Sequence, residues 1–140
     1  GVTRVPLTTL YRTADFITLH VPRTQKTIGM VDAAAFARMK RGVIFVNTSR
    51  AAVVDEKALI AALRSGKVRA AAIDVFEHPP GGVNPALVRL PNVIATPHVA
   101  GVSRESLRRV SSYIAESARL FLKRGTMRGL INPGVARRTP

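Results

Sequence analysis

Polar residues that could carry out chemistry follow directly behind four short apolar runs in this 140-residue sequence. The runs are rich in β-branched or small side chains and end abruptly, which is typical of buried strands in a parallel sheet. They cover residues 16–19, 43–46, 70–73 and 93–95. In such a sheet ligands bind outside the carboxyl ends of the strands, so the residues behind each run are candidates for a site. These residues are His20, the segment 47–50, Asp74 with Glu77 and His78, and the segment 96–98.

Arg50 and His98 are the two candidates whose chemistry is most informative. An arginine is permanently cationic and can hold a carboxylate or a carbonyl oxygen through two parallel hydrogen bonds. A histidine titrates near neutral pH and can pass a proton to or from a hydroxyl group. Together they suit the transfer of a hydride to or from a carbon that bears oxygen beside a carboxylate. The hydride itself requires a nicotinamide.

Each of these residues also has a plain structural explanation when it is taken alone. Arg50 could begin a helix or pair with a carboxylate, Asp74 could cap a helix or a turn, and His98 could be a hydrogen-bonded loop residue. Only the combination of the three favours a functional site.

Helical segments lie between the apolar runs and would bring these residues to one edge of a sheet. Asp32 and Asp55 are expected to cap the two helices that join the first three runs. A long helix with one apolar stripe is expected from Ser103 to near Gly125. Strands that alternate with helices specify a parallel sheet with right-handed crossovers, and we expect helices on both of its faces. The fold class is therefore α/β, with a doubly wound sheet.

The composition limits the classes of protein to which the chain can belong. Its 46% hydrophobic content supports one packed domain, and the absence of cysteine excludes disulfides and thiolate metal sites, so no metal is expected. No apolar run is long enough to cross a bilayer, so we expect no membrane partner and a cytoplasmic location.

The formal charge of +14 raises the question of nucleic-acid binding. The basic residues are spread along the chain, with two tyrosines and no tryptophan for base stacking, so no specific nucleic-acid partner is expected.

Whole segments of the sequence resemble the D-isomer-specific 2-hydroxyacid dehydrogenase family, which includes phosphoglycerate, glycerate, lactate and formate dehydrogenases. These segments are residues 15–22, the central signature from Met39 through Arg50 to Leu59, residues 72–77, and residues 92–94 with 96–101. They occur in order and at family-like separations. The resemblance implies a partial doubly wound, Rossmann-like parallel sheet with flanking helices, from the C-terminal part of a nicotinamide-cofactor domain.

The resemblance also implies roles for individual residues. Arg50 matches the catalytic arginine, His98 matches the catalytic acid/base, and Asp74 matches the aspartate that contacts the nicotinamide carboxamide. The cofactor is expected to be NAD or NADP. The residues expected to contact it are His20, Val21, Thr48, Ser49, Arg50, Asp74, His98 and Gly101. The implied substrate is a small D-2-hydroxy acid or the matching 2-oxo acid, and the complete protein is expected to be a homodimer.

One departure from the family pattern concerns the carboxylate that orients the catalytic histidine. In the family it lies five residues after the aspartate and just before a proline, and Pro79 stands at that position here. Proline cannot accept a proton from an imidazole. Glu77 could act as the third catalytic residue only if its loop shifts inward, so we expect weak turnover.

A second departure is the absence of a Gly-x-Gly-x-x-Gly sequence, which would form the cradle for the cofactor pyrophosphate. The family carries that loop upstream of the matched segments. We therefore expect residues 1–125 to be the C-terminal part of a cofactor domain that is inactive alone, and residues 126–140 to be a flexible tail. An alternative stays open: a non-catalytic interaction or cofactor-sensing module of the same fold, which the absent loop and Pro79 would permit.

Overall fold

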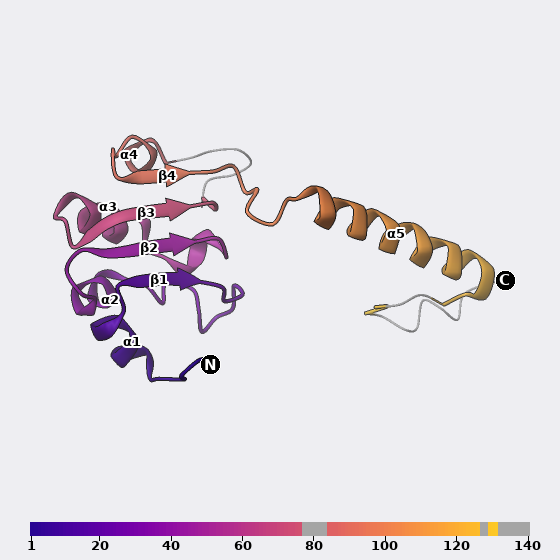
Figure 1. Cartoon of the computed structure of the whole chain (residues 1–140), viewed down its shortest axis with the longest axis horizontal. Helices are drawn as coiled ribbons and strands as arrows, with labels where there is room; N and C mark the ends of the chain where they lie inside the picture. The colour runs from indigo at the N-terminus through magenta and orange to yellow at the C-terminus, as the bar shows by residue number, and fades with distance from the viewer. Residues whose placement is uncertain (77–83, 127–128, 132–140) are drawn as a thin grey trace. The chain divides into compact units, whose positions relative to one another are not determined.

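The computed structural model describes residues 1–76, 84–126 and 129–131. The chain divides into two compact units, Gly1–Ala100 and Gly101–Pro140 (Figure 1). Most of the tail predicted at 126–140 lies outside the described residues, and the domain boundary predicted at residue 125 stays a prediction.

Four parallel strands form the sheet of the first unit, in the order β1-β2-β3-β4 (Figure 1). They are β1 (Phe16–Leu19), β2 (Val43–Asn47), β3 (Val68–Ile73) and β4 (Val93–Ala95). Each predicted apolar run is therefore a strand, and every neighbouring pair is parallel, as predicted. Because the strands are parallel, their carboxyl ends meet at one edge of the sheet.

Helices precede and join these strands. They are α1 (Leu7–Thr13), α2 (Ala33–Arg38), α3 (Glu56–Arg64) and α4 (Pro85–Val88), with a short 3-10 helix at Ala51–Val53. The two predicted helix caps are present. Oδ1 of Asp32 accepts the backbone N–H of Ala35. Oδ1 of Asp55 accepts the backbone N–H groups of Lys57 and Ala58, which fixes the start of α3.

The helices of this unit lie side by side on one face of the sheet. Each of α1 to α4 contacts the next, and alternate strand residues are buried. The buried row includes Ile17, Phe45 and Ala71, which pair across three strands. The alternation of strands and helices predicts helices on both faces, whereas the described helices of this unit lie on one. Right-handed crossovers that always step to the next strand in one direction return on the same side, so the opposite face keeps Phe16 and Ile94 each 69% exposed.

Phe45 lies at the centre of the core between the sheet and the helices. Its side chain is fully buried, and its ring meets that of Phe36 in α2 edge to face, with centroids 5.4 Å apart and planes at 67°. Leu59 of α3 and Leu87 of α4 are also fully buried. Burial of a side chain of this size contributes roughly 1.5–3 kcal/mol. This packing holds the strands, and with them the loops at their carboxyl ends, in a fixed arrangement.

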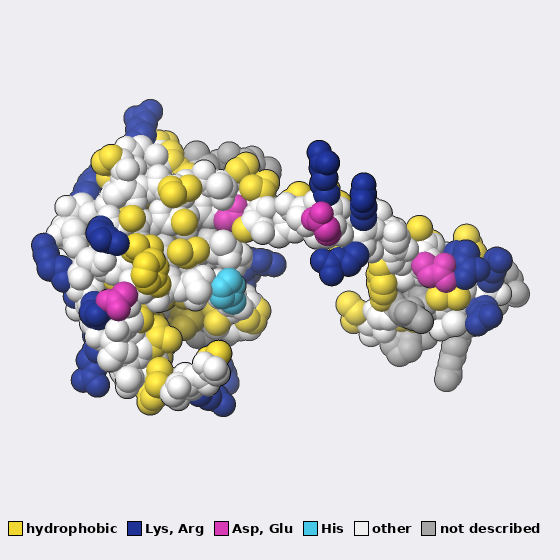
Figure 2. Space-filling view, viewed as in Figure 1, with side chains coloured by type: hydrophobic (Ala, Val, Ile, Leu, Met, Phe, Trp, Pro, Cys, Tyr) yellow, Lys and Arg dark blue, Asp and Glu magenta, His cyan; other side chains and the backbone are white. Residues whose placement is uncertain are grey.

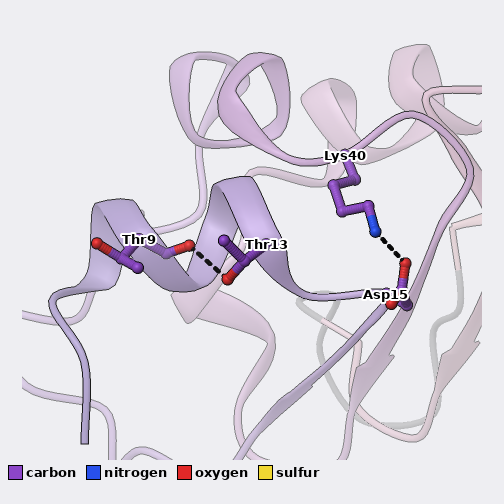
Figure 3. Close-up of polar contacts among 4 residues, drawn as sticks. All are labelled: Thr9, Thr13, Asp15 and Lys40. Carbon is purple, nitrogen blue, oxygen red and sulfur yellow. Dashed lines mark hydrogen bonds and ion pairs between the residues drawn. The ribbon is translucent and has the colours of Figure 1, made fainter.

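Polar contacts tie together the amino end of the sheet. The ammonium group of Lys40, which precedes β2, pairs with the carboxylate of Asp15, which precedes β1 (Figure 3). In the same view the hydroxyl of Thr13 donates to the carbonyl oxygen of Thr9 within α1. The pair of Lys40 and Asp15 joins the start of two neighbouring strands at the end of the sheet that carries no predicted site residue.

Two further cations hold the ends of helices near the start of β2 and β3. Nζ of Lys67 donates to the carbonyl oxygen of Ala37 at 2.8 Å, and the guanidinium of Arg41 donates to the carbonyl oxygen of Ser65 at 3.0 Å. Cations are favoured at helix C-termini, where carbonyl groups lack helical partners. On the face of the first unit that Figure 2 shows, Lys and Arg side chains are scattered rather than gathered in one patch. Part of the positive charge of the chain therefore has a structural role.

The second unit is built on α5 (Arg104–Arg124), the long helix predicted from the sequence. Oγ of Ser103 accepts the N–H of Ser106, and Oγ of Ser106 accepts the N–H of Ser103, which forms a capping box. The helix ends at Gly125, whose φ of 64° is left-handed. Exposed residues of its apolar stripe include Leu107, Val110 and Ile114. Within the described part of the chain, no helix has the length and hydropathy that crossing a membrane requires.

Candidate functional site

The carboxyl ends of β1 and β2 border a hollow of about 330 Å³. Its lining residues are His20, Val21, Pro22, Thr48, Ser49 and Arg50. All except the proline are residues that the sequence predicted to contact a cofactor. Small-molecule pockets begin at roughly 300 Å³. The structure therefore brings residues from two strand ends to one hollow that has room for part of a ligand.

His20 follows β1 at the rim of this hollow and is exposed. Its Nε2 lies 3.0 Å from the hydroxyl oxygen of Thr18, one hydrogen bond within its own strand region. This contact holds the imidazole beside the strand end, where it can meet a ligand.

Arg50 reaches the hollow from the loop behind β2. Its side chain is exposed and its backbone is extended, just before the 3-10 helix at Ala51–Val53. One terminal nitrogen of the guanidinium donates to the carbonyl oxygen of Ser49 at 2.6 Å, so the group bends back over its own loop. A guanidinium carries several N–H donors in a planar fork, and one internal contact leaves it able to bind an anion.

Asn47, the last residue of β2, holds the loop that carries Arg50. It is 2% exposed. Its Oδ1 accepts the backbone N–H and the hydroxyl of Ser49, both at 3.0 Å, and its Nδ2 donates to the carbonyl oxygen of Arg50 at 3.1 Å. The sequence indicated Asn47 only as a member of the segment 47–50. The signal that singles it out is its register, because it follows Val43 and Phe45 on the inward row, where an amide requires hydrogen-bonding partners.

Asp74 follows β3 and holds the loop that carries His98. It is 3% exposed. Its Oδ1 accepts the hydroxyl of Thr96 at 2.5 Å and the N–H of Val99 at 2.9 Å. Its Oδ2 accepts the N–H of Ala100 at 3.0 Å. These donors lie on both sides of His98 in the sequence, so the carboxylate brackets that residue.

The surroundings of Asp74 lower the pKa of its carboxyl group below the ordinary value of 3.8. Burial by itself raises this pKa, because it penalises the charged form. The hydrogen bonds from Thr96, Ala100 and Val99 outweigh burial, since they favour the carboxylate. The positive charge that His98 can carry acts in the same direction. Asp74 is therefore an anion at neutral pH, and its bonds to the loop are charge-assisted.

His98 is exposed and has a backbone φ of 58°. It is the one non-glycine residue with a positive φ in the described ranges. Conformations of this kind cost on the order of 1–3 kcal/mol and persist where the surroundings impose them, often at functional sites. The N–H of His98 donates to the carbonyl oxygen of Thr96 at 3.1 Å, which makes a tight turn directly behind β4.

Arg50 and His98 lie on the loops behind β2 and β4, so the end of β3 with Asp74 stands between them. The N–H of Asp74 donates to the carbonyl oxygen of Asn47 at 3.0 Å, which links the end of β3 to the end of β2. Both loops therefore belong to the same edge of one sheet, as the sequence predicted.

Other predicted residues are not brought to this edge by any contact that the structure describes. Gly101 belongs to the second unit, and Glu77 and Pro79 lie outside the described residues, so their roles stay predictions.

Ser49 is 7% exposed and its hydroxyl donates to Asn47, so its side chain supports the loop. Among the described residues, no cluster of three or more acidic or histidine side chains could hold a metal ion.

Comparison with known proteins identifies what this arrangement is similar to. Residues 1–100 match the profile of the family described as D-isomer specific 2-hydroxyacid dehydrogenase, NAD binding domain. The chain is 44% identical over 132 residues to the D-3-phosphoglycerate dehydrogenase of Archaeoglobus fulgidus, covering 94% of this chain and 25% of that protein. It is 41% identical over 140 residues to the glyoxylate reductase of Korarchaeum cryptofilum, covering 100% of this chain and 42% of that protein.

A solved structure gives the same result. The D-isomer specific 2-hydroxyacid dehydrogenase from Xanthobacter autotrophicus Py2, in complex with NADPH and MES, aligns with a TM-score of 0.72 and 34% identity. The alignment covers 93% of this chain and 53% of that one. The chain thus spans between a quarter and about half of the length of these relatives.

Proposed function

The chain belongs to the D-isomer specific 2-hydroxyacid dehydrogenase family, through its NAD-binding domain, and on this premise we propose that it contributes the nicotinamide side and the catalytic pair of an oxidoreductase. Its cofactor is NAD or NADP. The reaction we propose is hydride transfer between that cofactor and a small D-2-hydroxy acid or 2-oxo acid.

The residues around the hollow fit such a cofactor and such a substrate. The lining combines the guanidinium of Arg50 and the imidazole of His20 with an apolar wall of Val21 and Pro22. The flat nicotinamide ring can lie against an apolar wall, and an anionic acid requires a cation. When bound, the nicotinamide supplies or accepts the hydride.

In the proposed mechanism the two catalytic residues act on the substrate oxygens. Arg50 donates hydrogen bonds to the carboxylate or the carbonyl oxygen of the 2-oxo acid and holds it in one orientation. His98 donates a proton to the carbonyl oxygen as the adjacent carbon is reduced, and takes the proton back in the oxidation direction. One hydride and one proton convert the 2-oxo acid to the 2-hydroxy acid, so the balance closes without a further reactant.

The single observation that carries this proposal is the common edge. Arg50 and His98 are 48 positions apart in the numbering, yet their loops follow strands of one parallel sheet and each loop is anchored by a buried side chain. A guanidinium and an imidazole on one edge are the groups that the reaction needs.

We further propose that turnover requires a phosphate-binding loop from outside these 140 residues. The sequence contains no Gly-x-Gly-x-x-Gly, and backbone N–H groups of such a loop are what bind a pyrophosphate. A cytoplasmic location and a homodimer of the complete protein also stay predictions.

The substrate class follows from the names of the relatives. One is a glyoxylate reductase and another a D-3-phosphoglycerate dehydrogenase. Both names fit small acids with oxygen on the carbon beside a carboxylate. A third relative, from Citrobacter koseri, is named glyoxylate/hydroxypyruvate reductase B. Glyoxylate and hydroxypyruvate are therefore the first substrates to try.

A chimera tests the proposed function directly. The 140 residues replace the aligned segment of the Korarchaeum cryptofilum glyoxylate reductase, which supplies the remainder of the enzyme. Oxidation of NADH and of NADPH is followed by absorbance with glyoxylate and with hydroxypyruvate. We expect reduction of at least one acid, with a rate that depends on Arg50 and His98.

A chimera that is folded by circular dichroism and binds NADH, yet reduces neither acid, would overturn the catalytic proposal. That result would instead favour the non-catalytic module. Pro79, which stands where the family has the orienting carboxylate, is the sequence feature that favours this second candidate.

A further inference from the structure

Two buried polar side chains stand next to each other where β2 and β3 end. Asn47 and Asp74 are 2% and 3% exposed, and the backbone N–H of Asp74 donates to the carbonyl oxygen of Asn47. Within the described residues, four polar or charged side chains are buried, and three of them lie here, since Ser49 joins the pair. Buried polar groups are costly unless they are hydrogen-bonded, so this cluster calls for a specific explanation.

Each of the two side chains forms its hydrogen bonds with one loop: Asn47 with the loop that carries Arg50, and Asp74 with the loop that carries His98. Among the described residues, the side chain of Asn47 bonds to its own loop alone, through the N–H and hydroxyl of Ser49 and the carbonyl oxygen of Arg50. These bonds reach no more than three residues along the chain. They fix the path of the backbone from the strand end to Arg50.

Asp74 reaches much farther along the sequence. Its partners Thr96, Val99 and Ala100 lie 22, 25 and 26 positions later. Together they surround His98, whose left-handed backbone is unfavourable for a residue with a Cβ. The three bonds that these residues donate to an anionic acceptor can offset that cost, because charge-assisted hydrogen bonds are stronger than neutral ones.

Neither Arg50 nor His98 is held by burial of its own side chain, because both are exposed. Their positions relative to the sheet depend on the backbone that carries them. That backbone is anchored by the neighbouring residues rather than by the functional side chains.

We propose that Asn47 and Asp74 are a linked pair of positioning residues, in which Asn47 fixes the Arg50 loop, Asp74 fixes the His98 loop, and the backbone hydrogen bond between them sets one loop relative to the other. This inference rests on the proposed function for its consequence in catalysis. The anchoring itself does not depend on that function. One acceptor position on Oδ2 of Asp74 is left over by the contacts to the loop, so anchoring is compatible with the predicted contact to a cofactor amide.

Hydrogen exchange of the full chain, followed by NMR at neutral pH, tests the anchoring. Asp74→Asn keeps one acceptor oxygen and turns the other into a donor. We expect exchange of the Val99 and Ala100 amides to accelerate by roughly tenfold or more, since hydrogen bonds to charged acceptors are of that strength. Asp55→Asn is the matched control, because Asp55 also accepts two backbone amides but lies at the start of α3. It should leave both amides unchanged.

The same design applies to the other loop. Asn47→Asp preserves the acceptor for Ser49 but replaces the donor to the Arg50 carbonyl with an oxygen. We expect the amides that follow Arg50 to exchange faster. The matched control is Asn92→Asp, since Nδ2 of Asn92 also donates to a backbone carbonyl oxygen, that of Arg69 at 3.1 Å, at the amino end of the sheet. Unchanged exchange in both loops of the test variants, or equal acceleration in the controls, would overturn the anchoring.

Two milder variants keep the test decisive if the first pair folds poorly. Thr96→Val removes one bond to Asp74, and Ser49→Ala removes one bond to Asn47. In the chimera we expect each to lower kcat between roughly twofold and tenfold, because one hydrogen bond is lost. The KM for NADH should stay unchanged in Thr96→Val, because Thr96 does not line the hollow.

The outcomes separate the two ideas. If Arg50→Lys and His98→Gln lower kcat/KM for the acid while Thr96→Val and Ser49→Ala leave kcat unchanged, the positioning role is wrong and the proposed function stands. If Arg50→Lys and His98→Gln also leave kcat/KM for the acid unchanged, the proposed function is wrong, and the role in positioning a catalytic pair falls with it.

Discussion

The hydroxyl of Thr96 donates to Oδ1 of Asp74 at 2.5 Å, across 22 positions of the sequence. This bond joins the end of β4 to the end of β3 at the edge where the predicted catalytic residues lie. Its acceptor is a carboxylate whose pKa is lowered by the donors that surround it, although burial opposes the shift. The arrangement of this edge therefore depends on the ionisation of one buried group.

We predict that Asp74 makes stability depend on pH on the acid side. Because its folded-state pKa lies below the ordinary value of 3.8, its contribution is fully present above that value and is lost as the pH falls through the folded-state pKa. The measurement is the free energy of unfolding in urea, for the wild type and Asp74→Asn, from neutral pH down to about pH 2. The advantage of the wild type should be constant down to about pH 4 and then shrink. An advantage that stays constant throughout would contradict the assignment.

We predict that the two proposed catalytic residues differ in how their loss affects the chimera. His98→Gln removes the proton donor and should lower kcat by roughly 10²–10⁴-fold. Arg50→Lys keeps the charge but loses the planar fork, so kcat/KM for the acid should fall by roughly tenfold or more. Steady-state kinetics with glyoxylate checks both. Arg89→Lys is the control for the arginine, because Arg89 is exposed at the end of α4 and should leave kcat/KM unchanged.

The strands and helix caps could be predicted because their signals are local. Each apolar run fits a strand, and Asp32 and Asp55 precede helices that they cap with their own side chains. The residues directly behind the strands, Arg50 and His98 among them, follow from the rule that parallel strands finish at one edge.

The partners of buried polar side chains could not be predicted in this way. Nothing in the residues next to Asp74 indicates that it bonds to Val99 and Ala100, since those contacts depend on the path of a loop behind another strand. The left-handed backbone of His98 is uncommon for any residue with a Cβ, and nothing in the neighbouring residues indicates it. The one-sided arrangement of helices depends on strand order, which periodicity does not specify.

We predict that the 140-residue chain alone binds NADH only weakly. Its hollow at the ends of β1 and β2 has room for a small part of a dinucleotide, and the sequence contains no glycine-rich loop for the pyrophosphate. Isothermal titration calorimetry of the purified chain should give no saturable heat at micromolar concentrations. The chimera, in which the glyoxylate reductase supplies the remainder of the enzyme, serves as the positive control. Micromolar affinity of the chain alone would refute the prediction.

We predict that the isolated chain self-associates through its open sheet face. Phe16 and Ile94 are each 69% exposed on that face, and β1 is an edge of the described sheet. Exposed apolar faces and open edges favour association because they remove apolar surface from water and pair free backbone groups. Light scattering behind size-exclusion chromatography should show species larger than a monomer, with a share that rises with concentration. Phe16→Lys should shift the distribution towards monomer, whereas Val2→Lys, at a fully exposed residue outside the sheet, should not. A clean monomer of the wild type at every concentration would contradict the prediction.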